Sequence, residues 1–207
     1  LDEYRGMTIA PYYNNGLCLR GNFRFRAYVP GGDEIEDSFK LEIIVPDTFP
    51  QAIPEVRETG GRIPRNSNYH VNHDGSLCLG SPLRLLRKIY CSPCLSCFAE
   101  DCIVPYLYAV TLKLKYGGNF VFVELDHGEQ GILKDCSEIL WLKDSCKIKR
   151  AIQLLGLKKR IANKRPCPCG CGKRLGGCSF HYKLNEFRKM ASVSWFKAHV
   201  LNHLNSI

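Results

Sequence analysis

The cysteines are the residues of this chain whose number and spacing most directly suggest chemistry. The 207 residues include 12 cysteines, and most of them fall in two short clusters. The clusters consist of Cys91, Cys94, Cys97 and Cys102, and of Cys167, Cys169, Cys171 and Cys178. Cysteines this close together cannot all form unstrained disulfides, because each pair of sulfurs must meet at a specific separation. We therefore expect metal ligation or thiol catalysis rather than a disulfide framework.

The C-terminal cluster has the composition of a metal site. Glycines separate its cysteines and allow the backbone to fold around a single ion, and structural zinc sites use four sulfur or nitrogen ligands in a tetrahedron. We predict one structural zinc ion, held by Cys167, Cys169, Cys178 and either His181 or Cys171. The segment resembles the zinc-binding motif at the C terminus of the bacterial secretion ATPase SecA, although Ser179 occupies the last ligand position. A disulfide and an unligated loop are the alternatives.

The first cluster allows several interpretations. Cys91, Cys94 and Cys97 are spaced by threes, which would place them on one face of a helix. We expect these cysteines and Cys102 to pack in the core. A second metal or redox site, or a supporting role for another cysteine, remains open, since the spacing matches iron–sulfur motifs only in part.

Cys78 lies outside both clusters, in a long segment (53–83) that is rich in Gly, Pro, Asn and His and has little periodicity. Acyl transfer through a thioester needs an accessible thiolate and a hydrogen-bond donor for the tetrahedral oxyanion. We predict that Cys78 is the nucleophile and that the Asn72 amide or a nearby backbone N–H contacts the oxyanion. His70 or His73 would orient the loop or assist proton transfer, and we favour His70. The alternative is that Cys78 is a buried, inert residue between Leu77 and Leu79.

This stretch resembles the central region of ubiquitin-conjugating enzymes, over about residues 10–115. The family's Tyr-Pro…Pro-Pro-x-Val segment is matched by Phe49-Pro50 and Ile53-Pro54-Glu55-Val56. Its His-Pro-Asn motif is matched by His70-Val71-Asn72, and its catalytic turn by Gly75-Ser76-Leu77-Cys78-Leu79. The chain departs from the family by having Val71 in place of Pro, a shorter spacing to the cysteine, and no Trp soon after it.

The resemblance implies a transferase. Cys78 would carry the C-terminal carboxyl of a partner protein as a thioester and pass it to an amine. The divergent form looks most like bacterial members, several of which belong to CBASS anti-phage operons beside a nucleotidyltransferase that makes cyclic oligonucleotides. That enzyme would be the partner, and antiviral defence the role. A non-catalytic adaptor of the same fold and a nucleic-acid-binding zinc protein are the competing functions.

The elements that must position these residues follow from the hydrophobic pattern. Apolar and polar residues alternate over 17–29 and again over 38–45, as in strands with one buried face, and a short third strand is expected over 54–56. Helical spacing appears from about 98 to 112, from 147 to 161 and from 184 to 204. We predict an α+β fold: an antiparallel four-stranded meander with helices, UBC-like by resemblance, plus a small C-terminal helical zinc-binding module.

Charge divides the chain unevenly. Residues 1–142 carry 14 Lys and Arg against 18 Asp and Glu, whereas residues 143–207 carry 15 against 2. We predict two domains, a ubiquitin-conjugating-enzyme-like domain over 1–142 and a basic module with the zinc motif over 143–207. We expect an acidic protein partner for the basic module rather than nucleic acid. No uninterrupted apolar stretch or signal-peptide pattern is evident, so we expect a cytoplasmic protein without a membrane span.

Overall fold

The molecule consists of two compact units. The structure is a computed structural model that describes residues 4–11, 16–118, 120 and 129–198. Unit 1 comprises Leu1–Gly80 and Cys91–Glu124, and unit 2 comprises Ser81–Tyr90 and Leu125–Ile207. The chain therefore leaves unit 1 directly after the segment that holds Cys78 and returns to it at Cys91. The boundary predicted between residues 142 and 143 falls inside unit 2.

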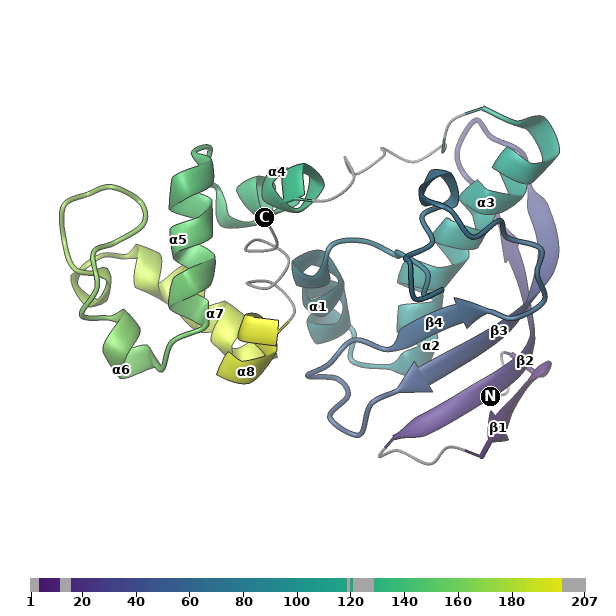
Figure 1. Ribbon diagram of the computed structural model, residues 1–207, viewed down its shortest axis with the longest axis horizontal. Helices are drawn as coiled ribbons and strands as arrows, with labels where there is room; N and C mark the ends of the chain where they lie inside the picture. Colours follow the sequence, from purple (N-terminus) through teal and green to yellow (C-terminus); the bar gives the residue numbers. More distant parts are fainter. Residues whose placement is uncertain (1–3, 12–15, 119, 121–128, 199–207) are drawn as a thin grey trace. The chain divides into compact units, whose positions relative to one another are not determined.

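Unit 1 is built on a four-stranded antiparallel sheet with the strand order β1-β2-β3-β4 (Figure 1). The strands are β1 (Met7–Ala10), β2 (Leu17–Ala27), β3 (Ile35–Val45) and β4 (Glu55–Glu58). Phe23 of β2 lies opposite Phe39 of β3, and both side chains are buried, while the neighbouring Arg24 is exposed. This alternation fixes the register, because a slip by one residue would move every apolar side chain to the other face. The predicted meander is confirmed.

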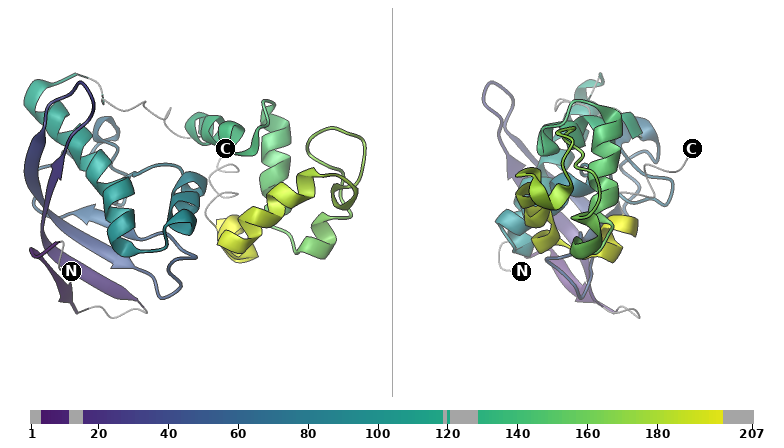
Figure 2. Two further views of the ribbon diagram at one scale, coloured as in Figure 1. Left: turned by 180° about the vertical axis from the view of Figure 1, so that it is seen from behind. Right: turned by 90° about the vertical axis from the view of Figure 1, so that its left-hand side faces the viewer.

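One long helical stretch packs on the sheet of unit 1 (Figure 2). It consists of α2 (Leu95–Phe98), the π-helical turn η2 (Ala99–Ile103) and α3 (Val104–Tyr116). Pro105 lies in the first turn of α3, where its missing N–H costs no hydrogen bond of that helix. The Tyr108 hydroxyl donates to the Asp33 carbonyl oxygen at 2.8 Å, which ties the helix to the β2–β3 turn.

This helical stretch corrects the expectation that the chain has no apolar segment long enough to span a membrane. Leu95–Tyr116 has 22 residues with a mean hydropathy of 1.3 in its most apolar window, so by length and composition it could cross a membrane. However, 56% of that window is buried inside the protein. Leu107 and Ala109 are fully buried. The core helix of a folded domain meets the same two criteria, which makes them weak evidence for a membrane span.

Unit 2 is helical. Its elements are α1 (Pro82–Cys91), α4 (Glu129–Leu140), α5 (Ser145–Leu155), α6 (Lys159–Ala162), the 3₁₀ turn η3 (Leu175–Gly177), α7 (Phe180–Met190) and α8 (Val193–Phe196). The helix predicted over 147–161 is interrupted at Gly156, which follows α5. The helix predicted over 184–204 starts earlier, at Phe180, and is interrupted at Ala191; its residues 199–204 lie outside the described part of the chain.

α5 is the central helix of unit 2 and contacts α4, α6, α7 and α8. Its buried residues include Ile152 and Leu155, which lie on one face of the helix. A second set of contacts is polar: Lys183 of α7 donates to the Leu140 carbonyl oxygen at 3.0 Å and lies 3.8 Å from the centroid of the Trp141 ring. These contacts join α7, which follows the cysteine-rich loop, to the end of α4.

Candidate thiol site and metal centre

Backbone pairing attaches the segment that carries Cys78 to the edge of the sheet in unit 1. Leu77 donates its N–H to the Val56 carbonyl oxygen in β4 at 2.8 Å, and Ser76 forms a bridge with Arg57 of the same strand. The Cys78 segment thus extends the sheet beyond β4. Because Leu77 is buried, the thiol that follows it is held at a fixed place on this edge.

The segment also folds back on residues 70–72. The Cys78 N–H donates to the His70 carbonyl oxygen at 2.8 Å, and the Asn72 N–H donates to the Ser76 carbonyl oxygen at 2.8 Å. Val71 and Leu77 form an antiparallel bridge between these two bonds. The structure therefore places His70 beside Cys78 and Asn72 beside Ser76, at opposite ends of one short hairpin.

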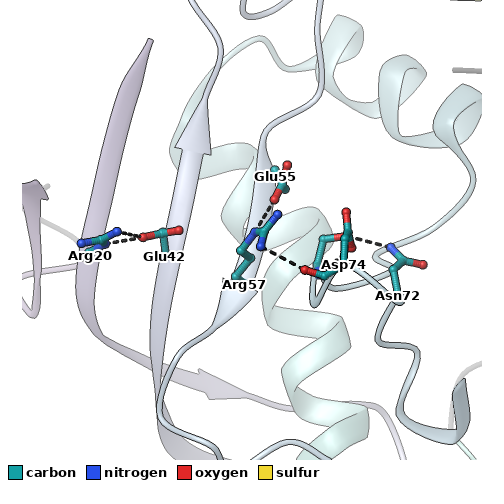
Figure 3. A network of polar contacts seen from close by, with 7 residues as sticks. Arg20, Glu42, Glu55, Arg57, Asn72 and Asp74 are labelled. Carbon is teal, nitrogen blue, oxygen red and sulfur yellow. Dashed lines mark hydrogen bonds and ion pairs between the residues drawn. The ribbon is translucent and has the colours of Figure 1, made fainter. Parts of the chain in front are cut away.

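The turn of this hairpin is held by its own side chains and by an arginine of β4 (Figure 3). Asp74 Oδ1 accepts hydrogen bonds from the Ser76 N–H at 3.0 Å and the Ser76 hydroxyl at 2.7 Å. The Ser76 hydroxyl is the main cause that lowers the pKa of the Asp74 carboxyl. Arg57 Nη1 donates to the Asp74 carbonyl oxygen at 3.0 Å, and Arg57 also pairs with Glu55. Gly75 has φ +85°, a conformation that glycine adopts at little cost.

Cys78 itself is a free cysteine that is half-buried. Burial raises the pKa of its thiol, and a hydrogen bond with the Gly80 backbone opposes this rise in part. The thiol is thus protonated at neutral pH and is partly open to solvent. A thiol that burial keeps protonated fits the inert alternative as well as the carrier, so the role of Cys78 stays a prediction.

Tyr106 of α3 is a neighbour of Cys78 that the sequence did not indicate. Its hydroxyl donates to the Tyr69 carbonyl oxygen at 2.7 Å, next to His70. Burial raises the pKa of Tyr106, and the nearby Cys78 adds to the rise. The phenol therefore stays neutral and serves to hold the start of the hairpin. Only the helical spacing of Tyr106 with Cys102 and Ala109 hinted that it faces the core.

The described contacts of the His70 and Asn72 side chains are with groups other than the Cys78 thiol. The His70 ring packs edge-on against Phe120, with centroids 4.7 Å apart, and the residue has a left-handed φ of 52°. Asn72 is exposed, and its side-chain amide donates to the Ser76 hydroxyl at 3.0 Å. Within the described residues, no hydrogen bond joins Asn72 to Cys78. The oxyanion role of Asn72 and the proton-transfer role of His70 stay predictions.

The first cysteine cluster differs from its prediction. Cys94 and Cys97 form a disulfide, Cys91 is exposed at the end of α1, and Cys102 is buried in η2. The predicted common helical face is wrong, because the helix ends before Ser92-Pro93 and a new one begins at Leu95. Burial in the core is confirmed for Cys102 alone.

The second cluster forms a group of four sulfurs. The Sγ atoms of Cys167, Cys169, Cys171 and Cys178 all lie within 4.8 Å of one another and could hold a metal ion. A short hairpin brings them together: the Cys167 N–H donates to the Lys173 carbonyl oxygen at 2.9 Å. Gly170 and Gly172, between the cysteines, have φ of +87° and +75°, which favour glycine. The Phe180 backbone N–H, together with hydrogen bonds from the other cysteines of the group, lowers the pKa of the Cys178 thiol to about 7.

The fourth member of this group is Cys171 rather than His181. The His181 Nδ1 lies 2.7 Å from the Cys178 carbonyl oxygen. A carbonyl oxygen only accepts hydrogen bonds, so Nδ1 carries the proton in this contact. Of the two alternatives for the fourth ligand, Cys171 and His181, the structure brings Cys171 together with the other three cysteines.

Comparisons with known proteins were made against family models, curated proteins and solved structures. No family model, no curated protein and no solved structure matches the chain. The family therefore remains a resemblance that rests on the residues quoted above, and the site must be interpreted from its own geometry.

Proposed function

We propose that the protein is an acyl carrier of the ubiquitin-conjugating type. Its Cys78 accepts the C-terminal carboxyl of a partner protein as a thioester and transfers it to an amine. The observation that carries this proposal is the position of Cys78: a half-buried free thiol, fixed by backbone pairing to β4 on one side and to His70 on the other. A carrier thiol must be both accessible and precisely oriented toward the carbonyl that it attacks.

The chemistry proceeds in two exchanges. The Cys78 thiol loses its proton to a base and attacks the carbonyl carbon of an activated carboxyl, and the activating group leaves with the electron pair of its former bond. The amine of an acceptor then attacks the thioester carbonyl carbon, Cys78 leaves as a thiolate, and the proton that the amine loses as the amide forms returns to this thiolate. Because burial raises the pKa of Cys78, the free thiol reacts slowly at neutral pH and needs an activated donor. The donor would be an adenylate or a thioester, as the resemblance implies.

A zinc ion at the four-cysteine group is the second part of the proposal. Four sulfurs suit a structural zinc ion, and a tetrahedron with bonds of about 2.3 Å has its sulfurs about 3.8 Å apart. In the group found here the Sγ–Sγ distances are 3.2 Å for Cys167–Cys169 and 3.7 Å for Cys169–Cys178, and all four sulfurs lie within 4.8 Å of one another, so small shifts would bring them to this spacing. When bound, the ion would fix the loop between α6 and α7.

The loop that the ion would fix presents cations. Seven exposed lysines and arginines border the cysteines, and none belongs to an ion pair between described residues. They are Lys158, Lys159, Arg160, Lys164, Arg165, Lys173 and Arg174. We include in the proposal that this surface steers an acidic protein to the enzyme, since complementary charge raises association rates. The resemblance to CBASS proteins suggests a nucleotidyltransferase that makes cyclic oligonucleotides as this partner, in antiviral defence.

The test of the carrier function uses a Cys78→Ser variant. A serine at this position would form an oxygen ester, which resists thiol treatment and accumulates. We expect the variant, expressed in cells that contain the native partner, to carry a protein adduct that alkali removes and dithiothreitol does not. Cys78→Ala is expected to carry none, and Cys91→Ala, which removes an exposed thiol of the same unit, is expected to behave as the unchanged protein. An adduct on Cys78→Ala would contradict the proposal.

A further inference from the structure

The disulfide of unit 1 lies at the beginning of the long helical stretch. Cys94 and Cys97 are separated by two residues, Leu95 and Ser96, and all four are half-buried. Cys94 is the N-cap residue of α2, and its Sγ accepts a hydrogen bond from the Cys97 backbone N–H at 3.0 Å. The pair thus combines the C-x-x-C spacing with a backbone donor directed at one of its sulfurs.

An apolar groove adjoins this disulfide. Its volume is about 600 Å³, and Leu95 and Ser96, the two residues between the cysteines, are part of its lining. Met7, Ile9 and Leu19 of the sheet contribute further apolar side chains. Ile9 is 66% exposed, which is high for a large aliphatic residue in a strand. A peptide segment lying in this groove would therefore contact the residues that join the two sulfurs.

The local geometry makes the two sulfurs unequal. A thiolate on Cys94 would be stabilised by the Cys97 N–H and by its place at the start of a helix. In thiol–disulfide exchange the sulfur that forms the more stable thiolate leaves more readily. An incoming thiolate is therefore expected to attack Cys97 and to displace Cys94.

We propose that Cys94–Cys97 is a thiol–disulfide exchange site, and that its substrate is an apolar peptide segment with two cysteines, bound in the adjoining groove. Such a segment matches both features at once, because apolar side chains fill the groove while a cysteine reaches the disulfide. This activity is independent of acyl transfer at Cys78.

The exchange moves two electrons from two thiols of the substrate to the Cys94–Cys97 disulfide. A thiolate of the substrate attacks Cys97 Sγ and forms a mixed disulfide, the Cys94–Cys97 bond breaks, and Cys94 leaves as a thiolate that takes up a proton. A second thiol of the substrate then displaces Cys97. The substrate dithiol is oxidised to a disulfide, and Cys94 and Cys97 are reduced to two thiols.

The first test measures reversibility in the full-length, folded protein that carries Cys78→Ala, so that the carrier thiol plays no part. The protein is incubated with graded mixtures of reduced and oxidised dithiothreitol, and each cysteine is quantified by differential alkylation and mass spectrometry. We expect Cys94 and Cys97 to convert together and reversibly, with unchanged circular dichroism. The control Cys91→Ser should titrate identically. A disulfide that is reduced only when the protein unfolds would overturn the proposal.

The second test examines the groove. In a Cys94→Ser variant, Cys97 is free to attack an oxidised dimer of a short apolar peptide with one cysteine, and the mixed disulfide cannot be resolved. We expect it to form about tenfold faster with this peptide than with oxidised glutathione, since binding raises the local concentration of the peptide. Ile9→Asp should remove this advantage without changing the rate with glutathione. Equal rates for peptide and glutathione, or equal slowing of both by Ile9→Asp, would contradict a role of the groove.

Discussion

At the scale of single residues, the environment of Cys78 sets the reactivity of its thiol. The raised pKa results from burial rather than from a neighbouring charge, and the hydrogen bond with Gly80 only moderates it. Thiolate, not thiol, is the reactive species. The folded protein therefore contains less thiolate at Cys78 than the unfolded chain does at the same neutral pH.

This leads to a prediction about pH. We expect alkylation of Cys78 by iodoacetamide to be slower in the folded protein than in urea at pH 7, and the difference to shrink as pH rises through the folded pKa. The same pKa shift also affects the free energy of unfolding. The unfolded thiol ionises first, near pH 8.5, so the stability that the shift contributes is fully present below that pH and is lost as pH rises through the folded pKa. Peptide mapping of Cys78 over pH 6–10 measures the rate; a folded thiol that reacts faster at pH 7 would contradict the assignment.

The residues also show what a sequence can and cannot indicate. Cys78 and His70 were found from the sequence because their order along the chain matched a motif, and the structure pairs their backbones. The partners of Asn72, the Cys94–Cys97 bond and the contribution of Tyr106 depend on where side chains point. Spacing alone could not distinguish His181 from Cys171, because both follow Cys169 within reach of one ion.

At the scale of elements, a buried carboxylate connects α1 to α4 within unit 2. Asp135 is 1% exposed, accepts a hydrogen bond from Ser81, and pairs with Arg84. Arg84 also reaches Glu138, which lies at the surface. A charge as deeply buried as Asp135 is stable only while its partners remain.

We predict that Asp135→Ala lowers the free energy of unfolding of unit 2 by about 2 kcal/mol, less than for a fully buried pair because Arg84 remains partly hydrated. Glu138→Ala is the matched control and should cost under about 0.5 kcal/mol, since exposed ion pairs contribute little. Urea unfolding followed by tryptophan fluorescence measures both values, because Trp141 and Trp195 are the two tryptophans of the chain and both lie in unit 2. Equal effects of the two variants would contradict the role of Asp135.

The cysteine-rich loop yields a second prediction at this scale. We expect the purified protein to contain about one zinc ion per chain, and Cys171→Ser to weaken its retention against a chelator strongly because a ligand is lost. His181→Ala should retain the ion, because His181 does not belong to the group of four sulfurs. Elemental analysis after chelator dialysis decides whether Cys171 or His181 is the fourth ligand. Loss of zinc from His181→Ala with retention in Cys171→Ser would identify His181 as that ligand.

The elements themselves were predictable in part. Strict alternation over β2 and β3 predicted the two long strands, since one face of each must be buried. α1 and α4 were missed: α1 follows a long irregular segment without helical cues, and α4 begins at Glu129, just after a stretch rich in glycine and charge. Both helices belong to unit 2, which is why the predicted boundary fell inside that unit.

At the scale of the whole molecule, positive charge is concentrated in one part of the chain. Residues 143–207 carry 15 Lys and Arg against 2 Asp and Glu, while residues 1–142 carry a net −4. Both an acidic protein and nucleic acid would be attracted to the basic part. The acidic remainder should weaken binding of a long polyanion by electrostatic repulsion.

We therefore predict weak binding of duplex DNA that is lost near physiological salt and does not strengthen with duplex length. Fluorescence anisotropy with a short and a long duplex at several salt concentrations measures this. In a Lys173→Gln, Arg174→Gln variant the residual binding should weaken, with a smaller salt slope because fewer counterions are released. Sub-micromolar, length-dependent binding at physiological salt would favour nucleic acid as the partner.

The central claim, that Cys78 carries an acyl group as a thioester, is tested most directly by the mass of the protein isolated from its native cells. We expect a fraction of the chain to carry a covalent protein adduct whose peptide maps to Cys78, and hydroxylamine or dithiothreitol at neutral pH to release it and restore the free thiol. Thioesters are cleaved under these conditions, whereas amides are not. An adduct that resists both reagents, or that maps to a residue other than Cys78, would contradict the account.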